Sequence, residues 1–138
     1  MIVDATGLVM GRLASVVATQ LLAGNEIKIV NAEKAIITGR RESIYEEYFA
    51  CRDRGHKERG PYFPRRPEMI MKRTVRGMLP YKLRRGRDAL SRLRIYVGVP
   101  RDLSGQQFEQ PQAAKVRGAS SANFIELGDL SKRLGAHF

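Results

Sequence analysis

The first thirty residues alternate between strand and helix patterns, and this alternation constrains the fold more than any other feature. Ile2 opens a short apolar run, and from Met10 to Leu21 apolar residues recur at helical spacing until Gly24 interrupts them. Residues 27–30, Ile-Lys-Ile-Val, then read as a second strand. Two strands joined by one helix favour a right-handed parallel crossover, so the sequence predicts an α/β fold.

The rest of the chain continues these patterns without an internal repeat or a linker, which predicts a single domain over residues 1–138. Further strand patterns cover 35–37, 95–99 and 124–125. Further helical patterns cover 41–49, 67–79, 85–93 and 127–134. The polar stretch 101–122, rich in Gln and Ser, is expected to form a loop with a short helical piece.

Two of the expected helices combine an apolar stripe with basic residues. The stripe of the 67–79 helix is expected to contact the core through Met71, Val75, Met78 and Leu79. The stripe of the 85–93 helix is expected to contact it through Ala89, Leu90 and Leu93. Between them, Gly77 and Pro80 are expected to set the turn.

The net charge is concentrated in one segment, residues 52–94, which we call the basic block. The whole chain has a formal charge of +11. The block alone supplies it, with fifteen basic residues against four acidic ones, and the remainder of the chain is neutral. A concentrated positive field indicates a polyanionic partner, which leaves nucleic acid, anionic membrane or acidic protein. A membrane agrees least with the sequence, because Gly and Pro repeatedly break the block. The preference for Arg over Lys suits phosphate and base contacts in a folded nucleic acid.

Within the basic block, residues 52–67 show no apolar periodicity and are expected to form an extended basic loop. The residues expected to contact the phosphates of a nucleic acid are Arg52, Arg54, Lys57, Arg59, Arg65, Arg66, Lys72, Arg73, Arg76, Lys82, Arg84, Arg85 and Arg87. Tyr62 and Phe63 lie in the same loop. They are expected either to stack on unpaired bases or to pin the loop to the protein core.

Catalytic, metal and cofactor sites are not indicated. His56 and His137 are far apart, and no acid–His pair is visible that would activate Cys51. Gly7 and Gly11 flank a strand-to-helix junction where a phosphate can bind, but no P-loop or Gly-x-Gly motif follows. A tight turn is therefore favoured there over a nucleotide site.

The cysteine content and the N-terminus bear on the compartment. Cys51 is the single cysteine, so no intrachain disulfide forms and a reducing environment suits the chain. Residues 1–4 lack the basic and apolar segments of a secretory leader, and no apolar run is long enough for a membrane span. We expect a cytoplasmic protein.

Three segments resemble one known family, large-subunit ribosomal protein thirteen. They are Gly-Arg-Leu-Ala-Ser at 11–15, Val-Asn-Ala-Glu-Lys-Ala-Ile-Ile-Thr-Gly at 30–39, and Arg-Thr-Val-Arg-Gly-Met-Leu-Pro at 73–80. The last of these is the most specific. Residues 60–65 and 96–100 look like the archaeal and eukaryotic cytosolic branch, whereas 105–122 show little resemblance to the family.

The resemblance implies a three-layer α/β/α fold around a mainly parallel four-stranded sheet. It also implies a structural place in the large ribosomal subunit, on large-subunit ribosomal RNA and beside neighbouring ribosomal proteins, with a role in early assembly. Within the basic block, Arg65, Arg73 and Arg76 are the residues that fall within matched motifs, and the other basic residues of the block are assigned on charge alone. We therefore predict a non-enzymatic RNA-binding protein of translation, without cofactor, membrane or small-molecule substrate. The alternatives are a nucleotide- or phosphosugar-binding α/β enzyme and a free-standing RNA-binding translational regulator.

Overall fold

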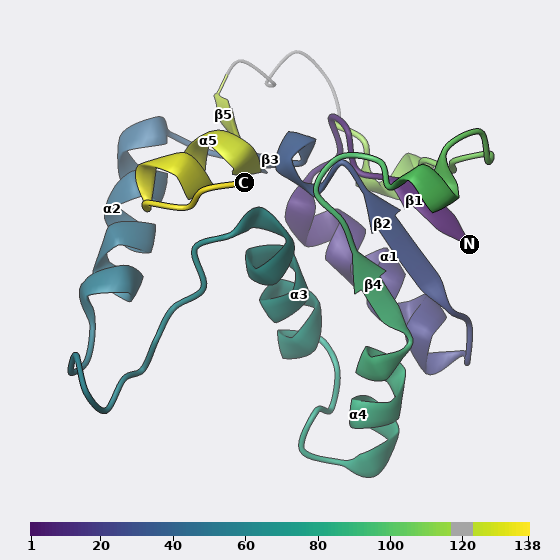
Figure 1. Ribbon diagram of the computed structural model, residues 1–138, viewed down its shortest axis with the longest axis horizontal. Helices are drawn as coiled ribbons and strands as arrows, with labels where there is room; N and C mark the ends of the chain where they lie inside the picture. The colour runs from purple at the N-terminus through teal and green to yellow at the C-terminus, as the bar shows by residue number, and fades with distance from the viewer. Residues whose placement is uncertain (117–122) are drawn as a thin grey trace.

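A small parallel sheet lies in the right-hand half of the molecule as seen in Figure 1. The structure is a computed structural model that describes residues 1–116 and 123–138. Strands β1 (Ile2–Asp4), β2 (Ile27–Val30) and β4 (Leu93–Ile95) pair in the order β1-β2-β4, and both pairings are parallel. Helix α1 (Met10–Leu22) joins β1 to β2 and lies behind the sheet in Figure 1, as the strand–helix–strand pattern predicts.

The prediction of a four-stranded, mainly parallel sheet is wrong, although the predicted α/β class is confirmed. Strand β3 (Ile36–Thr38) leaves the parallel sheet and pairs antiparallel with β5 (Phe124–Glu126). The chain turns away after β2 because Asn31 adopts a left-handed backbone conformation, with φ of 56°, and a 3-10 turn, η1 (Ala32–Lys34), follows. An Asp4 carboxylate oxygen holds this corner by accepting a hydrogen bond from Asn31 Nδ2 at 3.1 Å.

The free edge of β1 is covered by the polar 101–116 segment. The Asp4 amide donates to the Glu109 carbonyl at 3.0 Å, and the Glu109 amide donates to the Ile2 carbonyl at 2.9 Å. Short 3-10 turns at Arg101–Leu103 and Gln112–Ala114 match the expected loop with a helical piece. The remainder of that expected loop, residues 117–122, lies outside the described residues.

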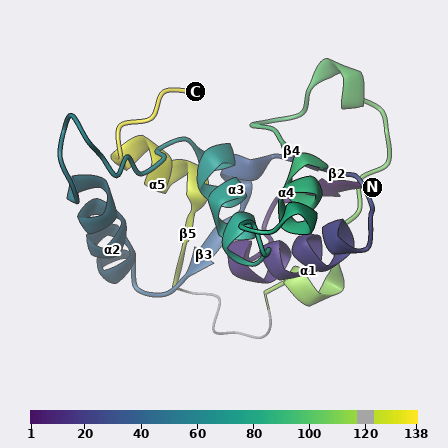
Figure 2. The same ribbon diagram turned by 90° about the horizontal axis from the view of Figure 1, so that it is seen from below.

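Four further helices surround the two sheets. They are α2 (Arg41–Asp53), α3 (Pro67–Gly77), α4 (Arg84–Ser91) and α5 (Leu127–Arg133), close to the expected positions. Figure 2 shows α3 and α4 side by side, with α1 along the opposite side of the sheet region from β4. No helix within residues 1–116 and 123–138 is long and apolar enough to span a membrane.

The prediction for the end of α4 and the strand after it is wrong by several residues. Leu93 belongs to β4 rather than to the helix, and the strand ends at Ile95 instead of reaching Val99. Beyond Ile95 the chain stays beside the end of β2, because the Asn31 amide donates to the Gly98 carbonyl at 3.0 Å and the Ala32 amide to the Tyr96 carbonyl at 3.2 Å. Gly98 has a positive φ of 69° and its amide donates to the Glu33 carboxylate at 2.9 Å, so a turn replaces the last part of the expected strand.

Helix α3 is bound to the core by its packing against α1. Its Ile70, Met71 and Val75 side chains are buried, in one cluster with Leu13 and Val17 of α1. The prediction that Met78 contacts the core is wrong, because this side chain is 44% exposed while Leu79 is buried. Met78 follows the last helical residue, so the chain has already turned when it reaches Leu79.

The turn between α3 and α4 depends on Gly86 rather than on Gly77, which was expected to set it. A Cβ at Gly86 would lie 2.0 Å from the Pro80 carbonyl oxygen and 2.8 Å from the Tyr81 amide nitrogen. A Cβ at Gly77 would have no atom within 4 Å. The α4 helix therefore reaches the preceding turn backbone only because residue 86 has no side chain.

We predict that Gly86→Ala lowers the free energy of unfolding by about 1–3 kcal/mol, because the turn backbone must shift to admit the methyl group. The matched variant Gly77→Ala should leave stability unchanged or raise it by up to about 1 kcal/mol, since alanine favours a helix. Urea denaturation followed by circular dichroism measures both. Equal midpoints for the two variants would contradict this role of Gly86.

Candidate nucleic-acid interface

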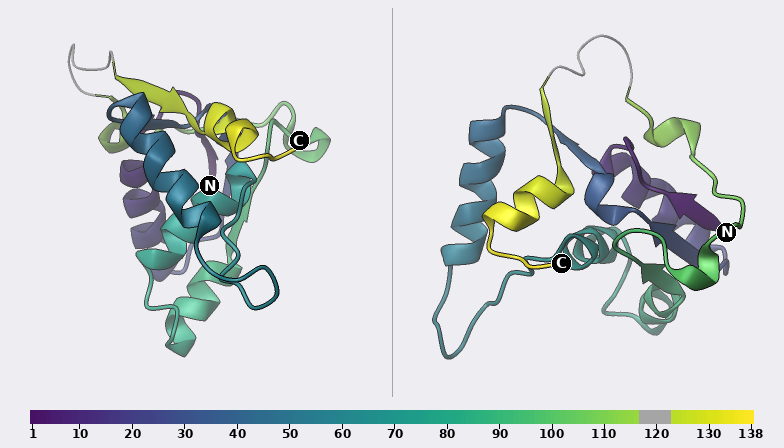
Figure 3. Two further views of the ribbon diagram at one scale, coloured as in Figure 1. Left: turned by 90° about the vertical axis from the view of Figure 1, so that its left-hand side faces the viewer. Right: turned by 45° about the horizontal axis from the view of Figure 1, so that its top comes forward.

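All thirteen basic side chains expected to contact RNA reach the surface. Twelve of these residues are exposed, and Arg52 is half-buried. Nine of them lie on two projections that extend in the same direction from the body (Figures 1 and 3), while Arg52 lies on α2 and Lys72, Arg73 and Arg76 lie on α3. One projection is the loop between α2 and α3, residues 54–66, which we call the basic loop. The other, which we call the α4 arm, is the turn after α3 together with α4 itself, residues 78–91.

Few acidic side chains neutralise these cations. Arg52 pairs with Asp53 at 3.0 Å, Arg66 with Glu68 at 2.8 Å, and Arg84 with Asp88 at 3.9 Å. Among the residues that the structure describes, the other ten of the thirteen make no ion pair. The Arg84 pair is highly exposed on both sides, so water screens most of its attraction. The surface therefore keeps nearly all of its positive charge.

Two further arginines of the basic block donate hydrogen bonds to backbone carbonyls. Arg92 Nη2 donates to the Leu21 carbonyl at 2.6 Å, which ties the end of α4 to the last turn of α1. Arg94 donates to the Ser91 carbonyl at 3.3 Å. Neither was among the expected contact residues.

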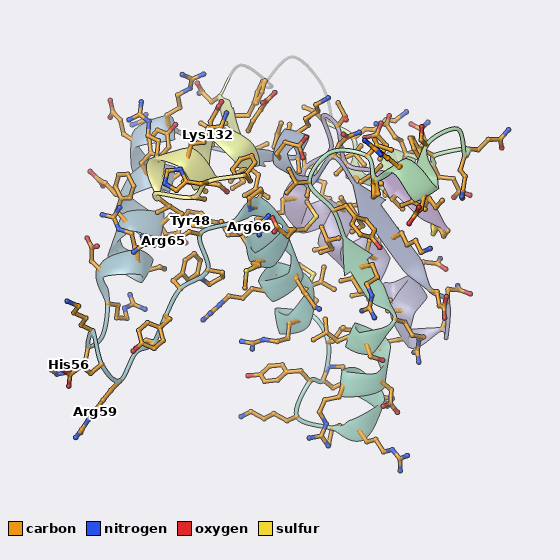
Figure 4. All side chains as sticks on the ribbon, in the orientation of Figure 1. Tyr48, His56, Arg59, Arg65, Arg66 and Lys132 are labelled. Carbon is orange, nitrogen blue, oxygen red and sulfur yellow. The ribbon has the colours of Figure 1, made fainter. Side chains whose placement is uncertain are left out.

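The basic loop is better organised than an extended segment without apolar periodicity is expected to be. His56 and Gly60 exchange two backbone hydrogen bonds, at 3.0 and 2.8 Å, which close a small hairpin at the tip. Tyr62 Oη donates to the Lys57 carbonyl at 2.7 Å. Figure 4 shows His56 and Arg59 at this tip and Arg65 and Arg66 at the base of the loop. The loop thus presents one group of cations at its tip and another at its base.

The two aromatic residues of the loop have different environments. Phe63 packs against the core, with its ring edge-to-face on Tyr48 at a centroid distance of 5.8 Å and the Arg73 guanidinium 5.1 Å from its own centroid. Phe63 therefore pins the loop, which decides between its two interpretations. Tyr62 is 68% exposed, and its ring remains available to a partner.

Three arginines of the block lie over aromatic rings. Arg52 lies 4.8 Å from the Phe49 centroid, and Arg76 lies 4.9 Å from that of Tyr81. Arg73 over Phe63 is the third. A ring face orients a guanidinium without neutralising it, so these side chains are held in place and stay positive. Tyr81 was not predicted in this role, although an aromatic residue next to a helix end rich in Arg is a usable signal.

Enzyme-like features are not assembled. No group of three or more potential metal ligands occurs within residues 1–116 and 123–138. Cys51 lies on α2 beside Tyr48, whereas His56 is at the loop tip. Burial, with Glu47 and Cys51 adding to it, raises the pKa of the Tyr48 hydroxyl above its ordinary value, so this phenol is neutral near pH 7.

Backbone carbonyls already accept hydrogen bonds from the three amides of the junction before α1. The Gly7 amide donates to Lys34, the Leu8 amide to Ala5 and the Val9 amide to Ala114, all to backbone carbonyls at 2.9–3.1 Å. A P-loop requires such amides to point at the ligand. The tight-turn interpretation of Gly7 therefore accounts for this junction.

These observations define a folded α/β body with an unneutralised basic face, and comparison with known proteins gives its family. The family described as Ribosomal protein L13 matches residues 1–102. A Methanosarcina barkeri protein named large ribosomal subunit protein uL13 is 55% identical over 138 residues, which cover 99% of both chains. The protein of that name from Methanococcoides burtonii is 51% identical over 137 residues, again 99% of both. That from Archaeoglobus fulgidus is 50% identical over 135 residues, 97% of this chain and 86% of the relative.

The chain belongs to the ribosomal protein L13 family. The resemblance inferred from the motifs at 11–15, 30–39 and 73–80 is confirmed, and these relatives are archaeal, in line with the expected branch. Family membership makes the chain a structural ribosomal protein of the cytoplasm and not an enzyme.

The packing of Phe63 generates a prediction about the basic loop. Phe63→Ala removes the contact with Tyr48, worth about 1 kcal/mol beyond the buried area, and also frees Arg73. Trypsin cleavage after Lys57 and Arg59 in the free protein should therefore become several-fold faster. Met69→Ala, at an exposed position outside the core cluster, is the control and should cleave like the wild type. Equal cleavage of both variants would contradict the anchoring role.

Proposed function

We propose that this protein is a structural component of the large ribosomal subunit, where it binds large-subunit ribosomal RNA through the basic loop, α3 and the α4 arm. One observation carries the proposal: ten exposed cations without an ion pair among the described residues lie on two neighbouring projections and on α3, which joins them, while the chain outside the basic block is neutral. The names of the relatives, large ribosomal subunit protein uL13, agree with this role.

The proposed contacts are mainly to phosphates. The basic loop offers Arg54, Lys57 and Arg59 near its tip, while the α4 arm offers Lys82, Arg85 and Arg87. Neutralising a phosphate releases counterions, so each such contact strengthens binding in a salt-dependent way. Contacts to phosphates fix the position of a protein on RNA and do not by themselves read the base sequence.

A supporting role in early assembly is consistent with how the body is built. Its core is built mainly from α1, α3 and the sheet, and the projections are attached to it through Phe63, Leu79 and Ala89. A body that folds before binding presents its cations already oriented, which lowers the entropic cost of binding RNA. Neighbouring ribosomal proteins are the further partners that we propose.

The alternatives have less support. A nucleotide- or phosphosugar-binding enzyme would need the junction before α1, whose amides at Gly7, Leu8 and Val9 are bonded internally. A free-standing translational regulator would use the same basic surface without entering ribosomes. Sedimentation separates that role from the proposed one.

The test compares two triple variants with matched residue types. Lys82, Arg85 and Arg87 are exposed members of the α4 arm, and Lys28, Arg40 and Arg101 are exposed residues outside the basic block. Changing each residue to Gln removes three positive charges in either variant. Arg73 and Arg76 are left intact because they also contact Phe63 and Tyr81.

We expect the α4-arm variant to lose about tenfold or more in affinity for large subunits at physiological salt, while the control triple sediments with them like the wild type. Sucrose-gradient fractionation with quantitative mass spectrometry of the subunit peak measures this occupancy, and circular dichroism verifies that both variants fold. Wild-type protein that remains at the top of the gradient would contradict the subunit role. Equal occupancy of the two variants would remove the α4 arm from the RNA interface.

A further inference from the structure

A groove separates the basic loop from α3 and α4, and its walls differ from the rest of the basic surface. Its volume is about 500 Å³. Aromatic and aliphatic groups of Tyr62, Phe63, Met69 and Leu90 form much of the lining, and Lys72 and Arg76 are among its cations. None of its lining residues is acidic. The groove therefore combines apolar walls with a purely positive charge.

Two large side chains stay open to solvent in this groove although nothing in the fold requires it. Tyr62 is 68% exposed and Met69 is 53% exposed. The hydrogen bond from Tyr62 Oη to the Lys57 carbonyl fixes the ring by its far end, and the adjacent Phe63 fixes the backbone through the core. The ring of Tyr62 is thus held in place before any partner binds.

We propose that this groove seats one unpaired base of the bound RNA, which stacks on Tyr62 and contacts Met69 while Lys72 and Arg76 hold the adjoining phosphates. Bases displaced from a helix are recognised by stacking on aromatic side chains, and the flanking phosphates need cations. The volume lies within the range of sites that enclose a small organic ligand, about 300–1,000 Å³. The proposal rests on the proposed binding of ribosomal RNA and adds an unpaired nucleotide to it.

Charge complementarity favours a nucleotide over a peptide segment of a neighbouring protein. A peptide in this groove would bury apolar surface but leave the cations without partners, unless it were acidic. A nucleotide matches both the apolar walls and the cations of the groove, because its base is a flat, largely apolar surface and its phosphate is an anion. The exposed ring of Tyr62 is then explained as a stacking platform.

The first experiment separates base contacts from phosphate contacts. Fluorescence anisotropy at low salt compares binding of the purified protein to a six-nucleotide oligoadenylate and to an abasic ribose-phosphate oligomer of equal length. The wild type should prefer the base-bearing oligomer by about tenfold, a typical effect of stacking one base on an aromatic ring. Tyr62→Ala should abolish this preference while its affinity for the abasic oligomer is unchanged. Tyr62→Phe, which keeps the ring, should retain most of the preference.

Each outcome bears on a defined part of the account. Equal wild-type affinity for the two oligomers would overturn the base seat and leave the subunit role standing. A preference that survives in Tyr62→Ala would also overturn it, since the base would then bind elsewhere. If neither oligomer binds, the phosphate contacts required by the proposed function are missing, and both proposals fail.

A second experiment identifies the occupant in assembled particles. An encoded diazirine amino acid replaces Met69, and in a control replaces Leu22, which is exposed on α1 far from the groove in sequence. After irradiation of purified large subunits, the probe at 69 should cross-link to large-subunit RNA more strongly than the probe at 22. Cross-links from position 69 to protein alone would show a peptide in the groove, and no cross-link at all would show an empty one. Either result overturns the proposal.

Discussion

The packing of α3 against α1 is the interaction on which the rest of the molecule depends. Ile70, Met71 and Val75 are buried between the two helices, and burying each such side chain contributes about 1.5–3 kcal/mol. The basic loop enters α3 at its N-terminus, and the α4 arm leaves it at its C-terminus. One buried helix face therefore fixes the positions of both basic projections. Without it, the cations would be attached to flexible segments and would lose their common direction.

Concentrated positive charge opposes folding through self-repulsion, and the structure limits this cost by geometry more than by pairing. The two projections place many of the cations away from the core and in water. Aromatic rings of Phe49, Phe63 and Tyr81 orient three arginines while leaving them charged. A carboxylate in the same positions would hold the arginines equally well but would cancel the field. The choice of aromatic partners is thus consistent with a surface that must remain positive until it meets a polyanion.

Much of this arrangement is predictable from local pattern, because α1, α3 and their flanking strands follow apolar periodicity closely. The missed features depend on single contacts between distant residues. The left-handed conformation of Asn31 sends β3 out of the parallel sheet, and a turn at Gly98, whose amide donates to the Glu33 carboxylate, stands where the apolar alternation predicts more strand. The concentration of positive charge in 52–94 is predictable from the sequence. The different roles of Tyr62 and Phe63 are not, because only the position of Tyr48 on α2 shows which of the two rings is anchored.

The central claim is that the basic loop, α3 and the α4 arm lie against RNA in the assembled subunit. Contact between RNA and the rest of the protein is not required. Lysine acylation followed by mass spectrometry, on the free protein and on purified large subunits, measures this most directly. The account predicts that Lys57, Lys72 and Lys82, one from each part of the surface, react readily in the free protein and are protected in the subunit. Digestion of the RNA should restore their reactivity. If all three lysines react as fast in intact subunits as in the free protein, the basic block does not face RNA and the account is wrong.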